Sequence, residues 1–326
     1  MHSPAPDRRQ DTNTTGLACA IEAQKAGFRV VLVDKGCVCN SLFHYPSHMT
    51  FFTTPELLEI GDIPFPSPNP KPTRNEALQY YRQVAAHYHL DVRQYHRVER
   101  VSGADGDFTV HTADRFGRPG SLHARKLVIA SGYYDLPNYL GIPGENLSKV
   151  HHYYFDPHPF YGMDVLVVGG KNSAAIAALE LWRIGARVTL VHRDAELHRH
   201  VKYWIKPDIE NRIKNGEVKA LFNSRLVEIH QDSVAIETPE GIQTLKNDFV
   251  FAMTGYHPDF TFLESFGIRF EGEDRRPMCN PQTLESNVNG IYLAGVIVAG
   301  SRTNEIFIEN GRFHGKLIAD ALRGKL

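Results

Sequence analysis

The chain has 326 residues, of which 42% are hydrophobic and 22% charged, and its formal net charge is −1 at pH 7. It is long enough for two globular domains, and its charge balance gives no reason to expect nucleic acid or an anionic membrane surface as a partner. No run of about eighteen apolar residues predicts a membrane span, residues 1–10 lack the apolar segment of a secretory signal, and four cysteines are too few for a disulfide framework. We therefore expect a cytoplasmic protein without a metal site.

Residues 16–34 and 174–192 form an internal repeat. In each copy small and apolar residues recur at helical spacing, a glycine follows (Gly27 or Gly185), and a β-branched run ends the copy. This order predicts a helix, a turn and a strand. A repeat of this length indicates two similar nucleotide-binding units in one chain.

The residues before the first copy depart from the pattern. The repeat would place a strand at residues 6–10 and a glycine turn at residues 11–15, but these read "PDRRQ" and "DTNTT", which leaves Gly16 as the last glycine of an incomplete fingerprint. Arg8 and Arg9 could not occupy a strand between buried neighbours without a cost of several kcal/mol. We interpret residues 1–15 as an altered start, from a wrong start codon, a frameshift or a truncation. The alternative is a natural variant that has given up flavin.

The second copy follows a complete strand–glycine–helix turn. Residues 165–168 predict a buried parallel strand, and "GGKNSA" then opens a helix, an arrangement that seats a pyrophosphate on backbone N–H groups. Lys171 stands where a middle glycine is usual, and a turn without a ligand is the alternative interpretation. The residues expected to contact a dinucleotide here are Gly169, Gly170, Lys171, Asn172 and Ser173.

The two repeat copies end on different residues. The first ends on Asp34, and a carboxylate at this point accepts hydrogen bonds from an adenosine ribose, as in FAD or NAD sites. The second ends on His192 and Arg193, where a cation would suit the 2′-phosphate of NADP. The alternative for His192 and Arg193 is a solvated strand end.

Three further apolar runs each end in a glycine, at Gly132, Gly255 and Gly295, and each predicts a short strand that a ligand can approach closely. Their order predicts two Rossmann-like, three-layer α/β dinucleotide-binding domains, the second inserted in the first. Residues 141–145 and 255–259 would be the connections. The expected FAD-binding domain comprises residues 1–142 and 257–326, and the expected NADPH-binding domain residues 143–256.

Four long segments carry a resemblance to a known family. They are "NSLFHYPSHMTFFTTPELLEIGDIPF" (40–65), "KPTRNEALQYYR" (71–82), "SGYYDLPNYLGIPGE" (131–145) and "NEIFIENGRFHG" (304–315). They closely resemble the bacillithiol disulfide reductases, two-domain flavoproteins of the thioredoxin reductase type, from about residue 16 onward. The resemblance implies FAD, NADPH and a low-molecular-weight disulfide substrate. It also implies a last helix, opening near Asn304, whose N-terminus points at the flavin.

The residues expected to bind FAD are Gly16, Asp34, Lys35, His48, Gly132, Gly295 and Asn304. Hydride would pass from NADPH to FAD and electrons then to the disulfide. Residues 151–162 contain no cysteine, which excludes the Cys-x-x-Cys relay of thioredoxin reductases, and Thr15 stands where some family members carry a cysteine. His152 is a candidate acid for the leaving thiolate.

The four cysteines are expected to have little catalytic use. Cys19 would be a buried hydrophobe, Cys279 would lie on a surface turn, and Cys37 and Cys39 are incidental or, as the alternative, redox-active. A flavin-dependent monooxygenase is the second enzyme class considered. A flavin-free NADPH-binding protein or inactive remnant is the third interpretation, and a homo-oligomer is possible.

Overall fold

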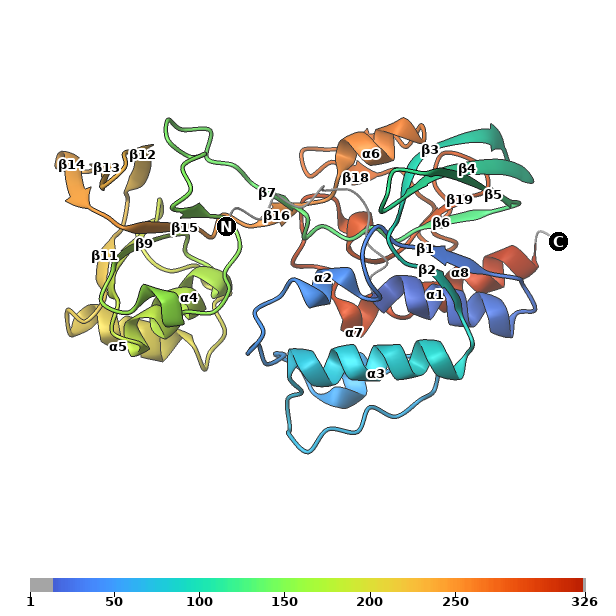
Figure 1. The fold of residues 1–326 in the computed structure, drawn as a ribbon, viewed down its shortest axis with the longest axis horizontal. Coiled ribbons are helices and arrows are strands. Elements are labelled where there is room, and N and C mark those ends of the chain that lie inside the picture. Colours follow the sequence, from blue (N-terminus) through green and yellow to red (C-terminus); the bar gives the residue numbers. More distant parts are fainter. Residues whose placement is uncertain (1–13, 325–326) are drawn as a thin grey trace. The chain divides into compact units, whose positions relative to one another are not determined.

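The structure, a computed structural model, describes residues 14–324. The chain divides into two compact units (Figure 1). The first unit comprises the described residues up to Leu136 together with those from Tyr256 onward, and the second unit is Pro137–Gly255. Both units are α/β, and the second is inserted in the first, as the sequence predicts. The strand position at residues 6–10 and the turn at residues 11–13 lie outside the described residues.

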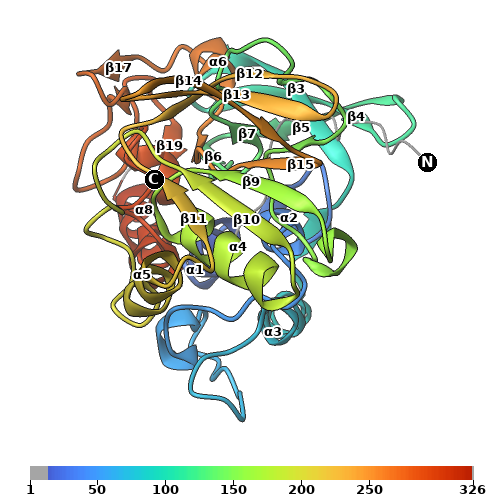
Figure 2. The same ribbon diagram turned by 90° about the vertical axis from the view of Figure 1, so that its left-hand side faces the viewer.

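The second unit contains a five-stranded parallel sheet of order β11-β10-β9-β15-β8. Its strands are β8 (Val150–His151), β9 (Asp164–Val168), β10 (Arg187–Val191), β11 (Lys219–Leu221) and β15 (Phe249–Ala252). Helices α4 (Asn172–Arg183) and α5 (Lys206–Lys214) cover one face, and an antiparallel meander covers the other (Figures 1 and 2). The meander consists of β12 (Arg225–Ile229), β13 (Ser233–Thr238) and β14 (Gly241–Lys246).

Strand β9 shows why these residues form a central strand. Val165 and Val167 lie in the core under α4, whereas Leu166 and Val168 lie in the core under the meander. Alternate side chains of a strand point to opposite faces, so a continuous apolar run is what a strand covered on both faces requires. The predicted strand and the helix that follows it are therefore confirmed.

The first unit has two parallel strand pairs. Strand β1 (Val31–Val33) pairs with β2 (Asp91–Arg93), and β6 (Leu127–Ile129) pairs with β19 (Ile291–Leu293). Within residues 14–324 the two pairs are separate sheets, and helix α1 (Thr14–Lys25) packs on both β1 and β6. The other strands of this unit are β3 (His96–Ala104), β4 (Asp107–Asp114), β5 (Pro119–Ala124), β17 (Phe270–Glu271) and β18 (Arg276–Pro277).

The remaining helices of the first unit are α2 (Asn40–Phe43), α3 (Arg74–His87), α6 (Phe260–Ser265), α7 (Ile308–Gly311) and α8 (His314–Arg323), with the 3-10 turns η1 (Pro55–Leu58) and η3 (Gly295–Ala299). The second unit adds η2 (His158–Phe160), and β7 (Leu136–Pro137) and β16 (Tyr256–His257) stand where the chain passes between units. No helix among residues 14–324 combines the length and apolar character needed to cross a bilayer.

Helices α1 and α8 approach each other closely because α8 carries a glycine at their contact. A Cβ atom on Gly315 would lie 2.7 Å from the carbonyl oxygen of Ala18 and 2.9 Å from the Cα of Cys19. Only a hydrogen at this position permits the two backbones to pack so closely.

The last helix does not begin where the sequence predicted. Residues 301–307 form turns, the first helical residue is Ile308, and the helix is interrupted between Gly311 and His314. The Ser301 hydroxyl and amide both donate to the Asp274 carbonyl, so this serine caps no helix. Instead, the Asn310 side chain accepts from the Phe307 amide and fixes the helix start there. Asn304 consequently lies on an exposed turn rather than at a helix N-terminus.

Candidate functional site

The turn between β9 and α4 admits only glycine at its first two positions. Gly169 has φ +141°, and a Cβ there would lie 2.6 Å from the Met253 carbonyl oxygen and 3.0 Å from the Ala174 Cβ. A Cβ on Gly170 would overlap the imidazole of His192. The turn therefore brings the backbone of β9, the start of α4 and the end of β10 together at the carboxyl edge of the sheet.

The start of α4 offers backbone donors at this edge. Lys171 is the N-cap residue, its backbone is extended, and no side chain of the described residues caps the helix there. The first-turn N–H groups of a helix have no intrahelical partner. Together with the positive end of the helix dipole they form an anion site. Lys171 and Ser173 are exposed at the same position.

Asn172 has a structural role that the sequence did not show. Its Oδ1 accepts a hydrogen bond from the Lys202 amide at 2.9 Å, and its Nδ2 donates to the His200 carbonyl at 3.4 Å. The His198 amide donates to the Gly170 carbonyl at 2.9 Å. The segment 197–205, which follows β10 and is called the latch loop here, is thus held against the glycine turn.

Positive charge gathers beside this turn, but not on His192. His192 is 9% exposed, and burial lowers its pKa, so the imidazole is neutral at pH 7. The cation that the sequence indicates at this strand end is therefore Arg193. Arg193 is exposed.

The latch loop supplies further cations. Burial lowers the pKa of His198, and the neighbouring charges of Lys171, His200 and Arg199 lower it further. These charges therefore lie close enough to one another to interact. The basic residues of this loop are visible in the sequence as "HRHVK" (198–202), which follows the predicted strand. They did not identify a site, because an ordinary solvated loop has the same composition.

In the first unit the predicted glycines Gly132 and Gly295 lie past neighbouring strand ends. Strands β6 and β19 pair in parallel with Ile129 opposite Leu293, and both glycines have positive φ, +71° and +77°. A Cβ on Gly295 would lie 3.1 Å from Thr15 Oγ1, and one on Gly311 would lie 3.2 Å from the same atom. The start of α1, which includes Gly16, is therefore enclosed by two glycine segments from the end of the chain.

Asp34 and Lys35 lie at the end of β1. The Asp34 carboxylate is fully buried, and its Oδ1 accepts a 2.7 Å hydrogen bond from the Gly36 amide. Lys35 forms an ion pair with Asp135, which lies just past Gly132. His48 is exposed on a turn. A buried carboxylate at a strand end and glycines at the adjacent strand ends fit the ribose and backbone-approach requirements of a flavin dinucleotide.

His314 is a further residue of this region that the sequence did not single out. Its Nδ1 accepts a 3.0 Å hydrogen bond from the Gly295 amide, and burial lowers its pKa, so a neutral imidazole holds the glycine turn. A single histidine at a helix start gives no sequence signal for such a contact.

Tyrosines form a cluster next to the Lys35–Asp135 pair. Ring centroids are 4.7 Å apart for Tyr45 and Tyr134, and 4.6 Å apart for Tyr134 and Tyr256. Tyr45 also hydrogen-bonds Tyr133, whose pKa is raised by burial. The cluster joins two of the segments that carried the family resemblance.

His152, the candidate acid, lies within the second unit. It is 11% exposed, its Nε2 is 3.5 Å from Glu145 Oε1, and its ring meets the edge of Tyr139 at 4.9 Å. The Glu145 carboxylate accepts from the amides of Leu140 and Gly141, each at 2.7 Å. These contacts hold the loop 139–145, and a role in proton transfer stays a prediction.

None of the four cysteines is in a disulfide. Burial raises the pKa of Cys19 to about 12 and also raises that of Cys279, so neither is a thiolate at neutral pH. Cys19 is buried in α1, as predicted, and Cys279 is half-buried. In the part of the chain that the structure describes, no three His, Cys, Asp or Glu side chains come together as a metal site would require.

Comparison with known proteins gives a near-complete match. A model of the family described as "Pyridine nucleotide-disulphide oxidoreductase" matches residues 14–295. The chain is 45% identical over 306 residues to Bacilliredoxin reductase Bdr of Bacillus subtilis, covering 93% of each chain. The solved structure of Bacillithiol Disulfide Reductase Bdr (YpdA) from Bacillus cereus superposes with a TM-score of 0.95 at 44% identity, covering 97% of this chain and 98% of that one.

A more distant structure bears on the fold alone. The thioredoxin reductase of T. acidophilum superposes with a TM-score of 0.74 over 97% of this chain, at 21% sequence identity. The two-unit dinucleotide-binding fold predicted from the sequence is therefore confirmed.

Proposed function

The chain belongs to the pyridine nucleotide-disulphide oxidoreductase family and, within it, to the bacillithiol disulfide reductases, and from this premise we propose that it reduces bacillithiol disulfide with electrons from NADPH. It is a flavin-dependent disulfide oxidoreductase, and its cofactors are FAD and NADPH, as expected from the family resemblance. The reaction would place the enzyme in thiol redox homeostasis.

The observation that carries the NADPH part of the proposal is the intact turn after β9. Gly169 and Gly170 bring the backbone close, and the uncapped start of α4 presents its N–H groups to the pyrophosphate. Lys171 and Ser173 are exposed there, and Arg193 would pair with the 2′-phosphate. Asn172 would act through the latch loop, since both ends of its amide bond that loop.

The first unit would hold FAD. Asp34 would accept the adenosine ribose hydroxyls, Gly132 and Gly295 would let the backbone approach the flavin, and Lys35 would fix Asp135 beside it. His48 and Asn304 stay predictions, and both are exposed. When bound, FAD supplies hydride acceptance from NADPH and electron delivery to a disulfide.

Electrons would reach the substrate without a protein dithiol. Residues 151–162, where thioredoxin reductases carry their Cys-x-x-Cys, contain no cysteine, and Cys19 and Cys279 are held as thiols by burial. A small disulfide bound directly beside the flavin needs no such relay. The monooxygenase and the flavin-free interpretations are not favoured by the comparisons.

The cellular location and the oligomeric state are also part of the proposal. We expect the enzyme in the cytoplasm, where NADPH and low-molecular-weight thiols are found together, and a homo-oligomer stays a prediction. Fractionation of cells and size-exclusion chromatography with light scattering would test them separately.

The proposed function is tested with the purified full chain under anaerobic conditions. Absorbance near ~450 nm reports bound flavin, and NADPH oxidation is then followed with bacillithiol disulfide, with glutathione disulfide and with no disulfide. We expect oxidation only with bacillithiol disulfide, and mass spectrometry should show two thiols for each disulfide. NADPH oxidation that requires oxygen and ignores the disulfide would contradict the proposal.

A further inference from the structure

One face of the parallel sheet in the second unit carries polar and partly exposed side chains near the amino ends of its strands. On β10, Val188 and Leu190 lie in the core under α4, and Val191 lies in the core under the meander. Alternation therefore puts Arg187 and Thr189 on the meander face. Lys219 of β11 lies on the same face, since Leu221 packs in the meander core. Strands covered on both faces are normally apolar throughout, so the meander leaves this end of the sheet open.

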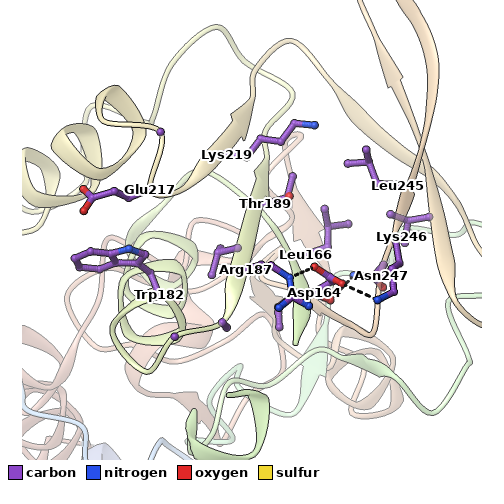
Figure 3. Close-up of a pocket in the computed structure, with 16 residues that line it drawn as sticks. Asp164, Leu166, Trp182, Arg187, Thr189, Glu217, Lys219, Leu245, Lys246 and Asn247 are labelled. Carbon is purple, nitrogen blue, oxygen red and sulfur yellow. Dashed lines mark hydrogen bonds and ion pairs between the residues drawn. The ribbon is translucent and has the colours of Figure 1, made fainter. Parts of the chain in front are cut away.

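A cavity of about 510 Å³ occupies that end (Figure 3). Its apolar lining comes from Leu166 of the sheet, from Leu245 and its cross-strand partner Val234 of the meander, and from Trp182 at the end of α4. In Figure 3, Trp182 and Leu245 stand on opposite sides of the opening. A cavity of this size accommodates a small organic molecule.

Most of the charges around the cavity are paired. Asp164 accepts from Arg187 at 2.6 Å and pairs with Lys246 at 3.2 Å, and Glu217 pairs with Arg212 at 2.9 Å. Lys219 lines the cavity and forms no ion pair with any residue among 14–324. The cavity therefore presents one unneutralised positive charge beside apolar walls.

We propose that this cavity is a second small-molecule site, which takes an aromatic anion. The apolar walls receive the ring and Lys219 receives the anionic group. The cavity lies at the amino ends of β9 and β10, whereas the nucleotide turn lies at their carboxyl ends, about 13 Å along the strand. The two sites are therefore distinct.

The test uses 8-anilinonaphthalene-1-sulfonate, which has an aromatic body and a sulfonate. Its binding to the full chain is measured by calorimetry with saturating NADP⁺, so that the nucleotide site is occupied. We expect one saturable site, weakened about tenfold or more by Lys219→Glu and lost in Thr189→Trp, which fills the cavity. Lys316→Glu, a change of equal charge on α8, should leave binding unchanged.

Circular dichroism and NADP⁺ affinity confirm that each variant is folded. Non-saturable binding, or binding that Lys219→Glu and Thr189→Trp leave unchanged, would overturn the proposal.

Discussion

The helix–turn–strand segments that begin at α1 and at α4 have the same elements but are enclosed differently. At α4 the crowding comes from the turn that directly precedes the helix, where Gly169 packs under Ala174 and against Met253. At α1 the crowding comes from the far end of the chain, where Gly295 and Gly311 close on Thr15. The start of α4 is thus enclosed by the glycine turn before it and by Met253 just past β15, whereas the start of α1 is enclosed by glycines near the end of the chain.

The strand ends differ in the same way. The buried Asp34 carboxylate accepts a hydrogen bond from the Gly36 amide, which fixes its position at the strand end. The second copy buries His192, whose pKa is lowered by burial, and leaves the Arg193 side chain exposed. This is the difference that we expect between sites for two nucleotides of different charge.

The largest effect is expected from Gly169→Ala. The new Cβ would meet the Met253 carbonyl and the Ala174 methyl at a φ that alanine avoids, so unfolding should become easier by on the order of 3 kcal/mol and NADPH binding should be lost. Gly27→Ala is the control, since Gly27 also has positive φ but nothing lies within 4 Å of its Cβ position. It should cost only about 1 kcal/mol. Thermal unfolding and NADPH titration measure both, and equal costs would contradict this account of the turn.

A charge reversal at Arg193 should have the next largest effect. Arg193→Glu removes the cation proposed for the 2′-phosphate, so KM for NADPH should rise on the order of thirtyfold while KM for NADH stays the same. Arg225→Glu, a reversal at an exposed residue of the same unit, is the control. Steady-state kinetics with both nucleotides would measure the change, and an equal rise for NADH would assign Arg193 to another part of the cofactor.

The parts of the fold that could be predicted from the sequence are those set by the spacing of apolar residues along the chain. Val165 to Val168 alternate between two cores, and this is visible in the sequence as an unbroken apolar run. The start of the last helix could not be predicted, because Asn304, where the resemblance places it, lies on an exposed turn and Asn310 fixes the start of the helix instead. The burial of His192 also could not, because it depends on the close approach of Gly170 in the folded chain.

The latch loop is the part of the candidate site that was least visible. Asn172 bonds residues some thirty positions later in the chain, and no local period records such a contact. Its identity within "GGKNSA" suggested contact with the cofactor, whereas its amide is used to hold a loop. Long-range polar contacts of this kind follow from the tertiary structure and not from residue spacing.

Asn172→Ala should release the latch loop. Two hydrogen bonds are lost, so KM for NADPH should rise about fivefold with kcat unchanged, and trypsin should cut faster after Arg199. The rise in KM and the faster cleavage should appear together. Asn211→Ala, at an exposed residue of α5, is the control and should change neither measurement. A higher KM without faster cleavage would mean that Asn172 contacts the cofactor directly.

The smallest expected effect is that of pH on the free energy of unfolding. Buried histidines in both units contribute to this effect, so the two units can be compared. Burial lowers the pKa of His151 and His192 in the second unit and of His314 in the first. Each therefore binds a proton more readily in the unfolded chain than in the folded one. Their contribution to stability is complete above about pH 6.5, the unfolded pKa. It is lost as the pH falls from there through the lowered folded pKa.

Single variants separate these contributions. His314→Asn keeps an acceptor for the Gly295 amide but cannot be protonated, so the free energy of unfolding should fall less steeply between pH 7 and pH 5 than in the parent chain. His192→Gln should flatten the same profile by a comparable amount, and the two changes together should add, because the residues belong to different units. Chemical denaturation at several pH values measures the slopes. An unchanged slope in His314→Asn would show that this imidazole is not held neutral by its burial.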